Sequence, residues 1–292
     1  MFYPVVDFRK SKLEICVLRT FPKLTTGCYN THMTWALKRQ LIYLLIVIAF
    51  VSILGYLIIN PMINKAPTCF DGKANGTETG VDCGGSCMIS CTLQVDKIGI
   101  LWSRAFQVVP GRYNAVAYLQ NKNENTVVQK INYRFRFADK DNVYIGKREG
   151  VTYVPPSGNF VVFEPALDVG NSIPVYTTFE FTSQPVWVKV PKDLVDQLKI
   201  LITDVNLTNE TTNPALSATI SNTSLFRIPN VSVVTILYDK LGNAISASHT
   251  YIDALTAQEK TQVNFTWREP IVGGVVEKEV IPMFNIFSVK LK

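Results

Sequence analysis

One uninterrupted apolar segment constrains this chain more than any other feature. Residues Leu41 to Asn60 read LIYLLIVIAFVSILGYLIIN and contain no charged side chain. A helix of this length, at about 1.5 Å per residue, spans about 30 Å, which is the thickness of the hydrocarbon core of a bilayer. Lipid offers the backbone no hydrogen-bond partners, so the segment must be helical there. The sequence predicts a transmembrane helix within residues 41–63, and Pro61, which lacks an N–H, is expected to end the helical run.

Three other interpretations of this segment are weaker. A buried core helix rarely runs this far without a charge. A cleaved signal peptide has an apolar region of about 7–15 residues followed by a site with small residues, and the residues after Asn60 offer no such site. A lipoprotein signal needs a cysteine at the end of the apolar run, whereas the next one is Cys69. We therefore expect a signal-anchor that is retained in the mature protein, so the lipid bilayer is one of its partners.

The distribution of charge predicts the orientation of this anchor. Residues 1–40 contain seven Lys or Arg and two Asp or Glu, a balance of +5, whereas residues 61–292 contain 22 and 21, a balance of +1. Lys38 and Arg39 lie directly before the apolar run, and the first cation after it is Lys65. Positive flanks stay in the cytoplasm. Residues 1–40 are thus expected to be cytoplasmic, with the rest extracellular or periplasmic. The near-neutral C-terminal part excludes a nucleic-acid partner.

The first residues of the chain have a separate interpretation. Met33 opens the stretch MTWALKRQ directly before the anchor, and residues 1–32 show no clear period. We expect that residues 1–32 are an extension of the gene model and that translation starts at Met33. Cys16 and Cys28 lie on the reducing side in this scheme, so they are interpreted as free thiols or as untranslated.

A short cysteine-rich segment, residues 67–92, follows the anchor. Cys69, Cys83, Cys87 and Cys91 fall within it, and five glycines lie between them. So short a segment cannot bury a core, and on the exported side its thiols can oxidise. Two disulfides are expected, and four cysteines allow three pairings. A zinc site is the alternative, although the spacing lacks the usual C-x2-C pair.

The same segment contains four oxygen-bearing side chains on a glycine-broken loop: Asp71, Asn75, Glu78 and Asp82. Calcium prefers six to eight oxygen ligands on a flexible loop. These residues are therefore candidate calcium ligands. The alternative is that they bond backbone N–H groups in turns, which is the commoner role of Asp and Asn.

The cysteine-rich segment resembles a motif of exported bacterial and archaeal proteins of unknown function. The motif reads roughly C-x-D-G-x-x-N-x-x-E-x-G-x-D-C-G-G-x-C-x-x-C. The match runs from Cys69 to Cys87, and Cys91 lies one residue later than the motif's last cysteine. The resemblance implies an extracellular setting and no particular activity.

From Leu93 onward, short apolar runs alternate with turn residues, which is typical of antiparallel β-structure. Residues 127–137 illustrate the alternation, with Ile131, Tyr133, Phe135 and Phe137 on one face. A second set of runs follows at offsets of 101, 100 and 102 residues: Asn222 after Asn121, Asp239 after Asp139, and Phe265 after Phe163. We predict a mainly β fold with two immunoglobulin-like β-sandwich domains, residues 93–190 and 199–292, joined by a linker at 191–198.

The second domain is similar to the FxLYD-type immunoglobulin-like domains of exported prokaryotic proteins. Leu237, Tyr238 and Asp239 carry this resemblance. It implies a binding or spacing role without a shared active site.

The sequence offers little catalytic chemistry. Its two histidines, His32 and His249, lie on opposite sides of the anchor, and no nucleophile-elbow, P-loop or dinucleotide motif is present. Glu164 and Asp168 are the carboxylates from which a glycosidase pair would have to be built. Six N-x-S/T sequons are candidate glycosylation sites: Asn75, Asn206, Asn209, Asn222, Asn230 and Asn264.

We therefore expect a membrane-anchored, non-enzymatic surface protein with a structural or binding role and no cofactor except the calcium considered above. Its partner would be a surface or envelope protein or a glycan. An accessory component of an envelope export or assembly complex is the first alternative, and an extracellular hydrolase is the second.

Overall fold

The computed structural model describes residues 15–16, 28–29, 34–63 and 68–290. They belong to two compact units, Met1–Ala66 and Pro67–Lys292, which we describe separately. The expected start at Met33 and the cation Lys65 lie outside the described residues.

The first unit consists mainly of one long helix. Helix α1 (Trp35–Ile63) has 29 residues, and two short strands, β1 (Ile15–Cys16) and β2 (Cys28–Tyr29), pair antiparallel before it. The mean hydropathy of Trp35–Asn60 is 2.9, and none of it is buried. At about 1.5 Å per residue, α1 is about 43 Å long. It is long and apolar enough to span a bilayer.

Helix α1 ends at Ile63, the last residue of the predicted span, but its start and the effect of Pro61 differ from the expectation. The helix begins at Trp35, because the N–H of Lys38 already bonds the carbonyl of Thr34 at 3.2 Å. The Arg39 guanidinium lies 4.5 Å above the Trp35 ring, a cation–π contact within the first turn. The expectation that Pro61 ends the helix was wrong, since α1 continues to Ile63. The missing N–H removes one bond but leaves the final turn helical.

The second unit is built from antiparallel sheets in two halves. The first half contains β3 (Gly99–Val109), β4 (Arg112–Asn121), β5 (Thr126–Ala138), β6 (Tyr144–Val154), β7 (Gly158–Asp168), β8 (Tyr176–Phe181) and β9 (Trp187–Lys189). The second contains β10 (Ile200–Thr208), β11 (Ala215–Asn222), β12 (Ile228–Tyr238), β13 (Ala244–Leu255), β14 (Lys260–Thr266) and β15 (Glu277–Met283). Helix α2 (Lys192–Gln197) connects the halves, and short 3-10 turns lie at η1 (Thr92–Gln94) and η2 (Ile286–Ser288).

The two halves have the same strand order. In the first half the sheets are β3–β4–β7 and β6–β5–β8, with β9 added to β5. In the second they are β10–β11–β14 and β13–β12–β15. Each half thus places its first, second and fifth strands in one sheet and its third, fourth and sixth strands in the other, as expected for a repeat.

One of the three predicted repeat matches was wrong by a residue. Ala117 of β4 pairs with Val162 of β7, and the equivalent Ala218 of β11 pairs with Val263 of β14. The offset is therefore 263 − 162 = 101, not 102. Because a shift of one residue exchanges the two faces of a strand, Phe265 points into the core of its own half, whereas Phe163 points toward the other half and stacks on His249.

The same polar corners recur in both halves. Oδ1 of Asp139 accepts bonds from the amides two and four residues later, and Oδ1 of Asp239 does the same. The turn places Asn142 at φ 60° and Gly242 at φ 75°, a left-handed conformation that Asn and Gly tolerate best. These local bonds explain why the predicted offset of 100 residues at this turn is found.

Each half has an apolar core between its two sheets. The largest fully buried side chains of the first include Leu119, Phe135 and Phe160, and those of the second include Leu216, Leu237 and Phe265. The alternation predicted for residues 127–137 is observed, with Ile131, Phe135 and Phe137 each no more than 1% exposed. The fold is mainly β, as predicted.

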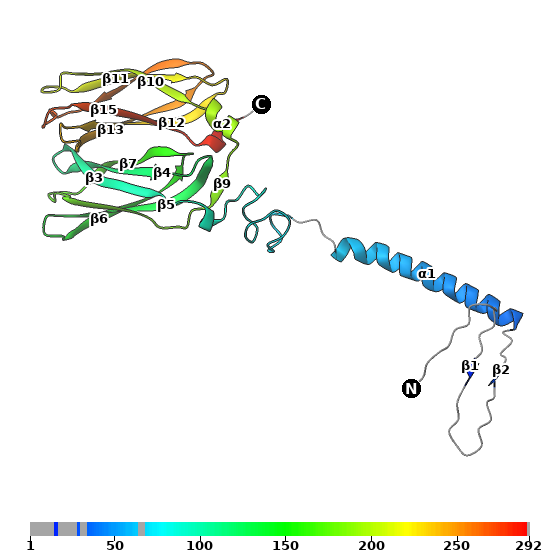
Figure 1. The fold of residues 1–292 in the computed structure, drawn as a ribbon. Helices are drawn as coiled ribbons and strands as arrows, with labels where there is room; N and C mark the ends of the chain where they lie inside the picture. The colour runs from blue at the N-terminus through cyan, green and yellow to red at the C-terminus, as the bar shows by residue number, and fades with distance from the viewer. Residues whose placement is uncertain (1–14, 17–27, 30–33, 64–67, 291–292) are drawn as a thin grey trace. The chain divides into compact units, whose positions relative to one another are not determined.

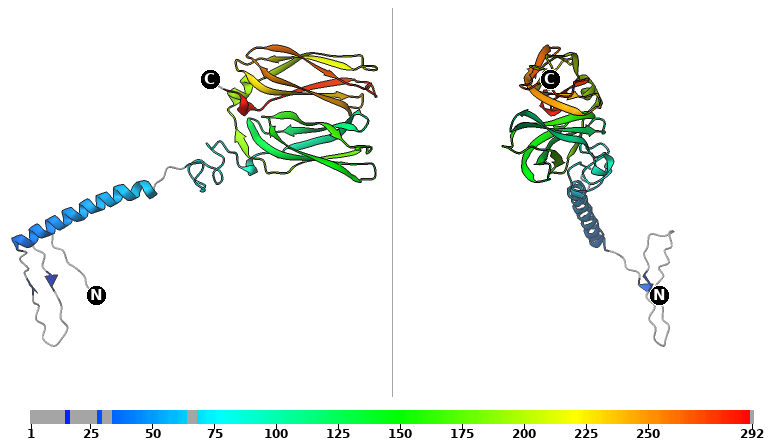
Figure 2. Two further views of the ribbon diagram at one scale, coloured as in Figure 1. Left: turned by 180° about the vertical axis from the view of Figure 1, so that it is seen from behind. Right: turned by 90° about the vertical axis from the view of Figure 1, so that its left-hand side faces the viewer.

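A third apolar layer joins the halves, because the β3–β4–β7 and β13–β12–β15 sheets pack face to face. Val234, Ile236, Ile281 and Met283 belong to the second half yet cluster with the core of the first. Figure 1 shows the resulting order of layers, from β6 and β5, through β3, β4 and β7, to β13, β12 and β15, and finally β10 and β11. Figure 2 shows the same layers from behind.

Candidate functional site

Two overlapping disulfides hold the cysteine-rich segment, residues 69–91, which we call the collar. Cys69 bonds Cys87 and Cys83 bonds Cys91, with Cα–Cα distances of 5.7 and 5.1 Å. The sequence had left three pairings open, and the structure selects this one. No thiolate of the four remains free to bind a metal, so the zinc alternative is wrong.

The turn between the second and third cysteines requires glycine. Gly85 has φ +52°, and a Cβ there would lie 1.7 Å from the carbonyl oxygen of Thr77. Gly84 has φ +78°, and its Cβ would lie 1.8 Å from Thr79 Oγ1. No side chain fits at either position. This turn brings residues 77–79 against the Cys83–Cys87 segment.

The carboxylates of the collar bond the backbone of its own loop. Oδ1 of Asp82 accepts bonds from the N–H groups of Asp71 and Gly72, at 2.9 and 3.0 Å. Oδ2 of Asp71 accepts a 2.9 Å bond from Asn75 Nδ2, which holds the pKa of Asp71 below its ordinary value. Both carboxylates have the turn-forming role that was the alternative to calcium binding.

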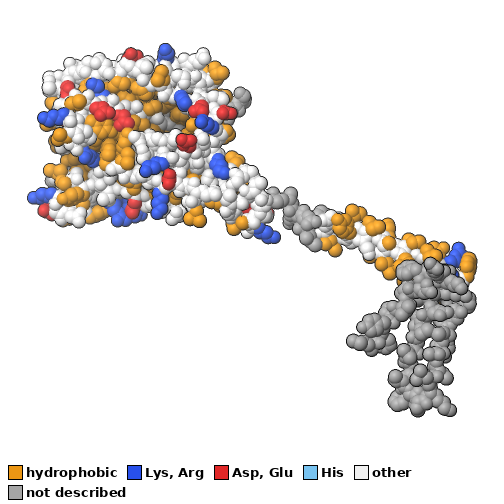
Figure 3. Space-filling model, viewed as in Figure 1, with side chains coloured by type: hydrophobic (Ala, Val, Ile, Leu, Met, Phe, Trp, Pro, Cys, Tyr) orange, Lys and Arg blue, Asp and Glu red, His pale blue; other side chains and the backbone are white. Residues whose placement is uncertain are grey.

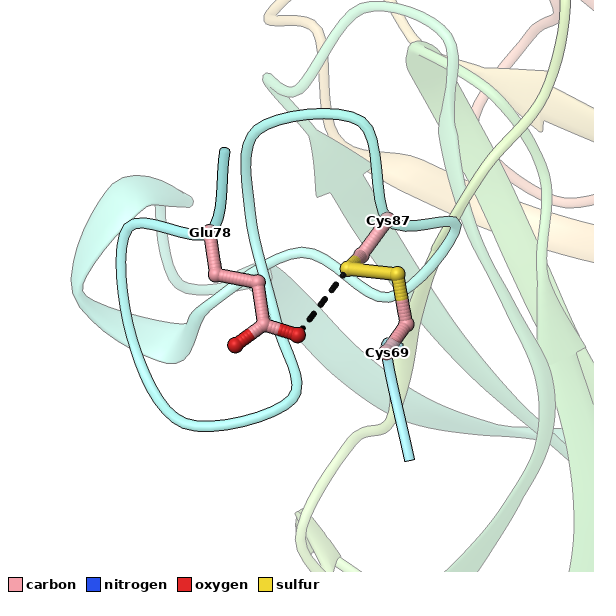
Figure 4. Close-up of side chains that lie close together, drawn as sticks. All are labelled: Cys69, Glu78 and Cys87. Atoms are coloured by element: carbon pink, nitrogen blue, oxygen red, sulfur yellow. Dashed lines mark hydrogen bonds between the residues drawn. A yellow bond between two sulfur atoms is a disulfide. The ribbon is translucent and has the colours of Figure 1, made fainter. Parts of the chain in front are cut away.

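The other two candidate calcium ligands lie close to a disulfide. Glu78 Oε2 accepts a 3.2 Å bond from the Asn75 N–H, and Oε1 lies 3.5 Å from Cys87 Sγ (Figure 4). Ligand atoms of Cys69, Glu78 and Cys87 lie within 4.8 Å of one another. Sulfurs bonded to each other are not thiolates, however, so this trio is not a metal site. Calcium binding by Asp71, Asn75, Glu78 and Asp82 stays a prediction.

The collar is hydrogen-bonded to β9 of the first sandwich. The Ser90 N–H donates to the Trp187 carbonyl at 2.9 Å, and the Lys189 N–H donates to the Met88 carbonyl at 2.7 Å. Lys189 Nζ also donates to the Gly85 carbonyl at 2.8 Å. The two backbone bonds flank the antiparallel bridge between Ile89 and Val188, so residues 88–90 add one short segment to the edge of the sheet at β9. The collar is therefore a fixed extension of the sandwich.

The contact between the sandwiches has a polar centre that the sequence did not suggest. Glu279 of β15 accepts a 2.7 Å bond from Tyr118 on Oε1 and a 2.8 Å bond from Tyr238 on Oε2. Asn159 Nδ2 donates to the Tyr118 oxygen at 2.9 Å, and the Trp102 ring stacks on Tyr118 at 5.3 Å. Burial, followed by the Glu279 bond, raises the pKa of both tyrosines well above 10.

Two further bonds cross the same contact. Arg104 of β3 donates to the carbonyl of Ala244 at 2.9 Å, and the N–H of Val161 lies 3.3 Å from Met283 Sδ. Together with the apolar layer, these bonds connect strands more than 100 residues apart in the chain. The sequence had a signal for this contact in two runs without alternation, Ala115–Leu119 and Val233–Leu237, the second of which is interrupted only by Thr235, because a strand buried on both faces is apolar at nearly every position.

His249 lies on the strand β13, with Nε2 2.9 Å from Ser232 Oγ and its ring stacked on Phe163 at 5.2 Å. Desolvation lowers the pKa of His249 below 6.5, so the ring is neutral at pH 7. Among the described residues no carboxylate bonds this histidine. The pair therefore lacks the group that orients the base of a catalytic triad.

The two carboxylates considered for glycosidase chemistry have separate structural bonds. Glu164 accepts a bond from the Tyr133 hydroxyl, and Asp168 accepts a 3.1 Å bond from the Gly170 N–H. Burial raises the pKa of Tyr133 above its ordinary value. Both carboxylates therefore accept hydrogen bonds that stabilise the fold, and no shared site joins them.

The six sequons differ in how available their asparagines are. Asn206, Asn209, Asn230 and Asn264 are exposed, whereas Asn75 is half-buried. Asn222 is 1% exposed, and its Nδ2 donates to the carbonyls of Phe226, Leu255 and Thr256. The folded domain has no room for a glycan at Asn222.

An apolar groove of about 540 Å³ lies where the two sandwiches meet near α2. Its lining includes Leu198, Ile200, Met283, Phe284 and Ile286. Its lining contains one titratable side chain, Lys199, and no cluster of such groups.

Comparisons with known proteins identify no family. No family model matches the sequence, and no curated protein matches it. Two solved structures are similar over part of the chain. A red sea bream transglutaminase is 9% identical over 66% of this chain and 30% of its own, with a TM-score of 0.24. A beta-glucuronidase from glycoside hydrolase family 2 is 12% identical over 76% of this chain and 29% of its own, with a TM-score of 0.21. The chain thus spans about 30% of these proteins, and likeness this low carries no argument about function.

Proposed function

We propose that this chain is a single-pass membrane protein whose β-rich part lies outside the cytoplasm and has a structural or binding role. The lipid bilayer is its first partner, through Leu41–Asn60, and a surface or envelope protein or a glycan is its second. The immunoglobulin-like character of the sandwiches and the relationship to exported prokaryotic proteins belong to the same proposal.

Helix α1 carries this proposal. Its apolar side chains are exposed from Trp35 to Ile59, and Figure 3 shows hydrophobic side chains along the helix with cations at its N-terminal end. So much exposed apolar area is costly in water and is matched by lipid. The positive-inside rule then favours a cytoplasmic N-terminus.

The collar gives independent support for the orientation. Its two disulfides begin six residues after α1 ends, at Cys69 against Ile63. Disulfides persist on the oxidising side of a membrane and are rare in the cytosol. A disulfide-bonded collar on the C-terminal side of the helix therefore favours export of residues 67–292.

Protease shaving of intact cells tests the topology. With an epitope tag after Lys292, we expect external protease to remove the tag from intact cells. The double substitution Lys38→Asn and Arg39→Asn removes the cytoplasmic cations and should protect a fraction of the tag, whereas Lys240→Asn should not. A tag that stays protected until the membrane is permeabilised would contradict the proposal.

Crosslinking on intact cells separates the binding role from the alternative of an export or assembly accessory. Reproducible capture of secretion components favours the accessory role, and capture of other surface proteins or of glycan favours the first proposal. Hydrolysis is the remaining alternative. Turnover by residues 67–292 that is lost in Ser232→Ala, His249→Ala or Glu164→Gln would establish it against our proposal.

A further inference from the structure

We propose that the outer face of the β10–β11–β14 sheet carries N-linked glycans, with Asn206 and Asn264 as paired acceptors. This inference rests on the proposed export of residues 67–292. It goes beyond that proposal by assigning a modification to one face of the fold, and it is argued from the register, exposure and hydrogen bonding of four of the six sequons.

The two asparagines lie in one row of the sheet. Asn206 of β10 pairs with Ser217 of β11, and Ser217 pairs with Asn264 of β14. Neighbouring strands lie about 4.8 Å apart, so the two side chains project from the same face about 10 Å from each other. Both are exposed, and among the described residues neither side-chain amide has a protein partner.

The hydroxyl of each sequon lies on the same face as its asparagine. Residues i and i+2 of a strand share a face, so Thr208 stands beside Asn206, and Thr266 beside Asn264. Both threonines are exposed and lie in one row across Ala215. The residue between the asparagine and the threonine of the β14 sequon is Phe265, 2% exposed in the core. The fold therefore presents both polar groups of each sequon together.

The surroundings of the pair are mainly polar, with one carboxylate beside them, Asp204, which accepts a 3.0 Å bond from Thr203 Oγ1. The next row of this face contains Thr203, Thr219 and Gln262. The opposite outer face of the unit, on β6–β5–β8, carries instead an ion-pair network that includes Arg134, Glu149 and Glu180. A face of hydroxyls and amides matches the hydrogen bonding of a sugar, and it lacks the aromatic and arginine anchors of a protein interface.

Two sequons of the same consensus act as internal controls. Nδ2 of Asn222 donates to three carbonyls at 2.7–3.3 Å, so a glycan there would remove these bonds and stop the corner from folding. Nδ2 of Asn75 donates to Asp71 at 2.9 Å. In the folded protein both nitrogens are occupied, whereas those of Asn206 and Asn264 are not.

The covalent step needs a sugar donor of a stated class. Nδ2 forms a bond to the anomeric carbon of an oligosaccharide that is activated as a lipid-linked phosphate ester. The anomeric C–O bond breaks, the lipid phosphate leaves with its electron pair, and the amide loses one proton. No oxidation or reduction is involved. Such a donor resides in the same membrane that α1 is proposed to span.

Intact-glycopeptide mass spectrometry of the full chain, purified from membranes of its source organism, tests the inference. We expect a sugar mass on the peptides containing Asn206 and Asn264, and none on the peptide containing Asn222. Thr208→Ala and Thr266→Ala each destroy one sequon but keep the asparagine, and each should remove one increment from the gel shift. Thr203→Ala, on the same face and outside any sequon, should remove none.

The outcomes distinguish this inference from the proposed topology. Unmodified Asn206 and Asn264 in cells whose C-terminal tag is shaved from outside overturn the glycan inference alone. A sugar on Asn222 at equal occupancy also overturns it, because the fold would then select no site. A tag protected in intact cells, with unmodified asparagines, overturns both proposals.

Discussion

The hydroxyl of Tyr118 lies 2.7 Å from Glu279 Oε1, and this bond joins β4 of the first sandwich to β15 of the second. The other oxygen of the same carboxylate accepts from Tyr238. One acidic side chain thus satisfies two tyrosines inside an apolar contact between two sheets. We infer that the contact is specific in register, since only one alignment of the sheets pairs these three groups.

Glu279→Ala should lower the free energy of unfolding of residues 67–292 by about 1–3 kcal/mol, because two half-buried hydroxyls lose their acceptor. Glu277→Ala, an exposed position on the same strand, is the control and should change it by less than about 0.5 kcal/mol. Urea denaturation measures both. Equal effects of the two substitutions would show that the shared carboxylate contributes nothing to the contact.

Four tyrosines predict that the fold weakens at alkaline pH. Burial raises the pKa of Tyr118, Tyr133, Tyr153 and Tyr238 above the ordinary value of 10. Above pH 10 the unfolded chain releases these protons while the folded one keeps them. The unfolded state then binds fewer protons, and stability falls as pH rises. Below pH 10 these tyrosines are protonated in both states and cause no change in the free energy of unfolding with pH. Urea midpoints between pH 8 and 11 measure the effect.

The substitution Tyr118→Phe is the matched test of this assignment. It removes one titrating group without removing the ring, so the fall in stability above pH 10 should be shallower than in the parent chain. An identical slope would assign the alkaline weakening to other groups. Tyr251→Phe, which removes the hydroxyl of an exposed tyrosine, is the comparison variant.

The buried side chains of Asn121 and Asn222 should contribute about equally to stability. Asn222 and Asn121 each donate to carbonyls that are hidden from water and each accept an N–H two residues later. Replacement of either by Ala should cost about 2–4 kcal/mol, because several buried groups lose their partners at once. Asn264→Ala is the control, because it changes an exposed side chain, and it should lower the free energy of unfolding by less than about 0.5 kcal/mol. Thermal unfolding of the three variants gives the comparison.

Local bonding explains which parts of the fold could be predicted from the sequence. The turns at Asp139 and Asp239 use bonds within five residues, so equal spacing in the sequence gave equal turns in the structure. In β7 the four residues Phe160–Phe163 are all apolar, so both faces of the strand look alike there and alternation could not fix its register. The match to Phe265 was therefore wrong by one residue.

The long-range contacts could not be predicted in the same way. The mostly apolar runs at Ala115–Leu119 and Val233–Leu237 indicate strands buried on both faces, but they do not say what covers the second face. Glu279 lies 161 residues from Tyr118, and nothing local connects them. Four cysteines likewise allow several pairings, and only the folded turn at Gly84 and Gly85 selects one.

The disulfides give the last prediction, which concerns the stability of the collar. The Cys69–Cys87 bond has a sequence separation of 18, and the Cys83–Cys91 bond one of 8. Because the entropy removed from the unfolded chain grows with loop length, loss of the first should cost about 3 kcal/mol and loss of the second about 2.5 kcal/mol. A protease should cleave within residues 69–91 faster when either disulfide is removed. The increase should be larger for loss of the Cys69–Cys87 bond than for loss of the Cys83–Cys91 bond.

Trypsin offers a direct measurement of the pairing, because it cuts after Lys73 between the first two cysteines. Without reductant, the peptides 66–73 and 74–97 should stay linked in the parent chain and in the Cys83→Ser, Cys91→Ser double variant. They should separate in the Cys69→Ser, Cys87→Ser variant, since the remaining bond lies within one peptide. Separation of the two peptides in the Cys83→Ser, Cys91→Ser variant would mean that Cys69 bonds Cys83 or Cys91 in the parent chain, and the fixed position of the collar on β9 would then need another explanation.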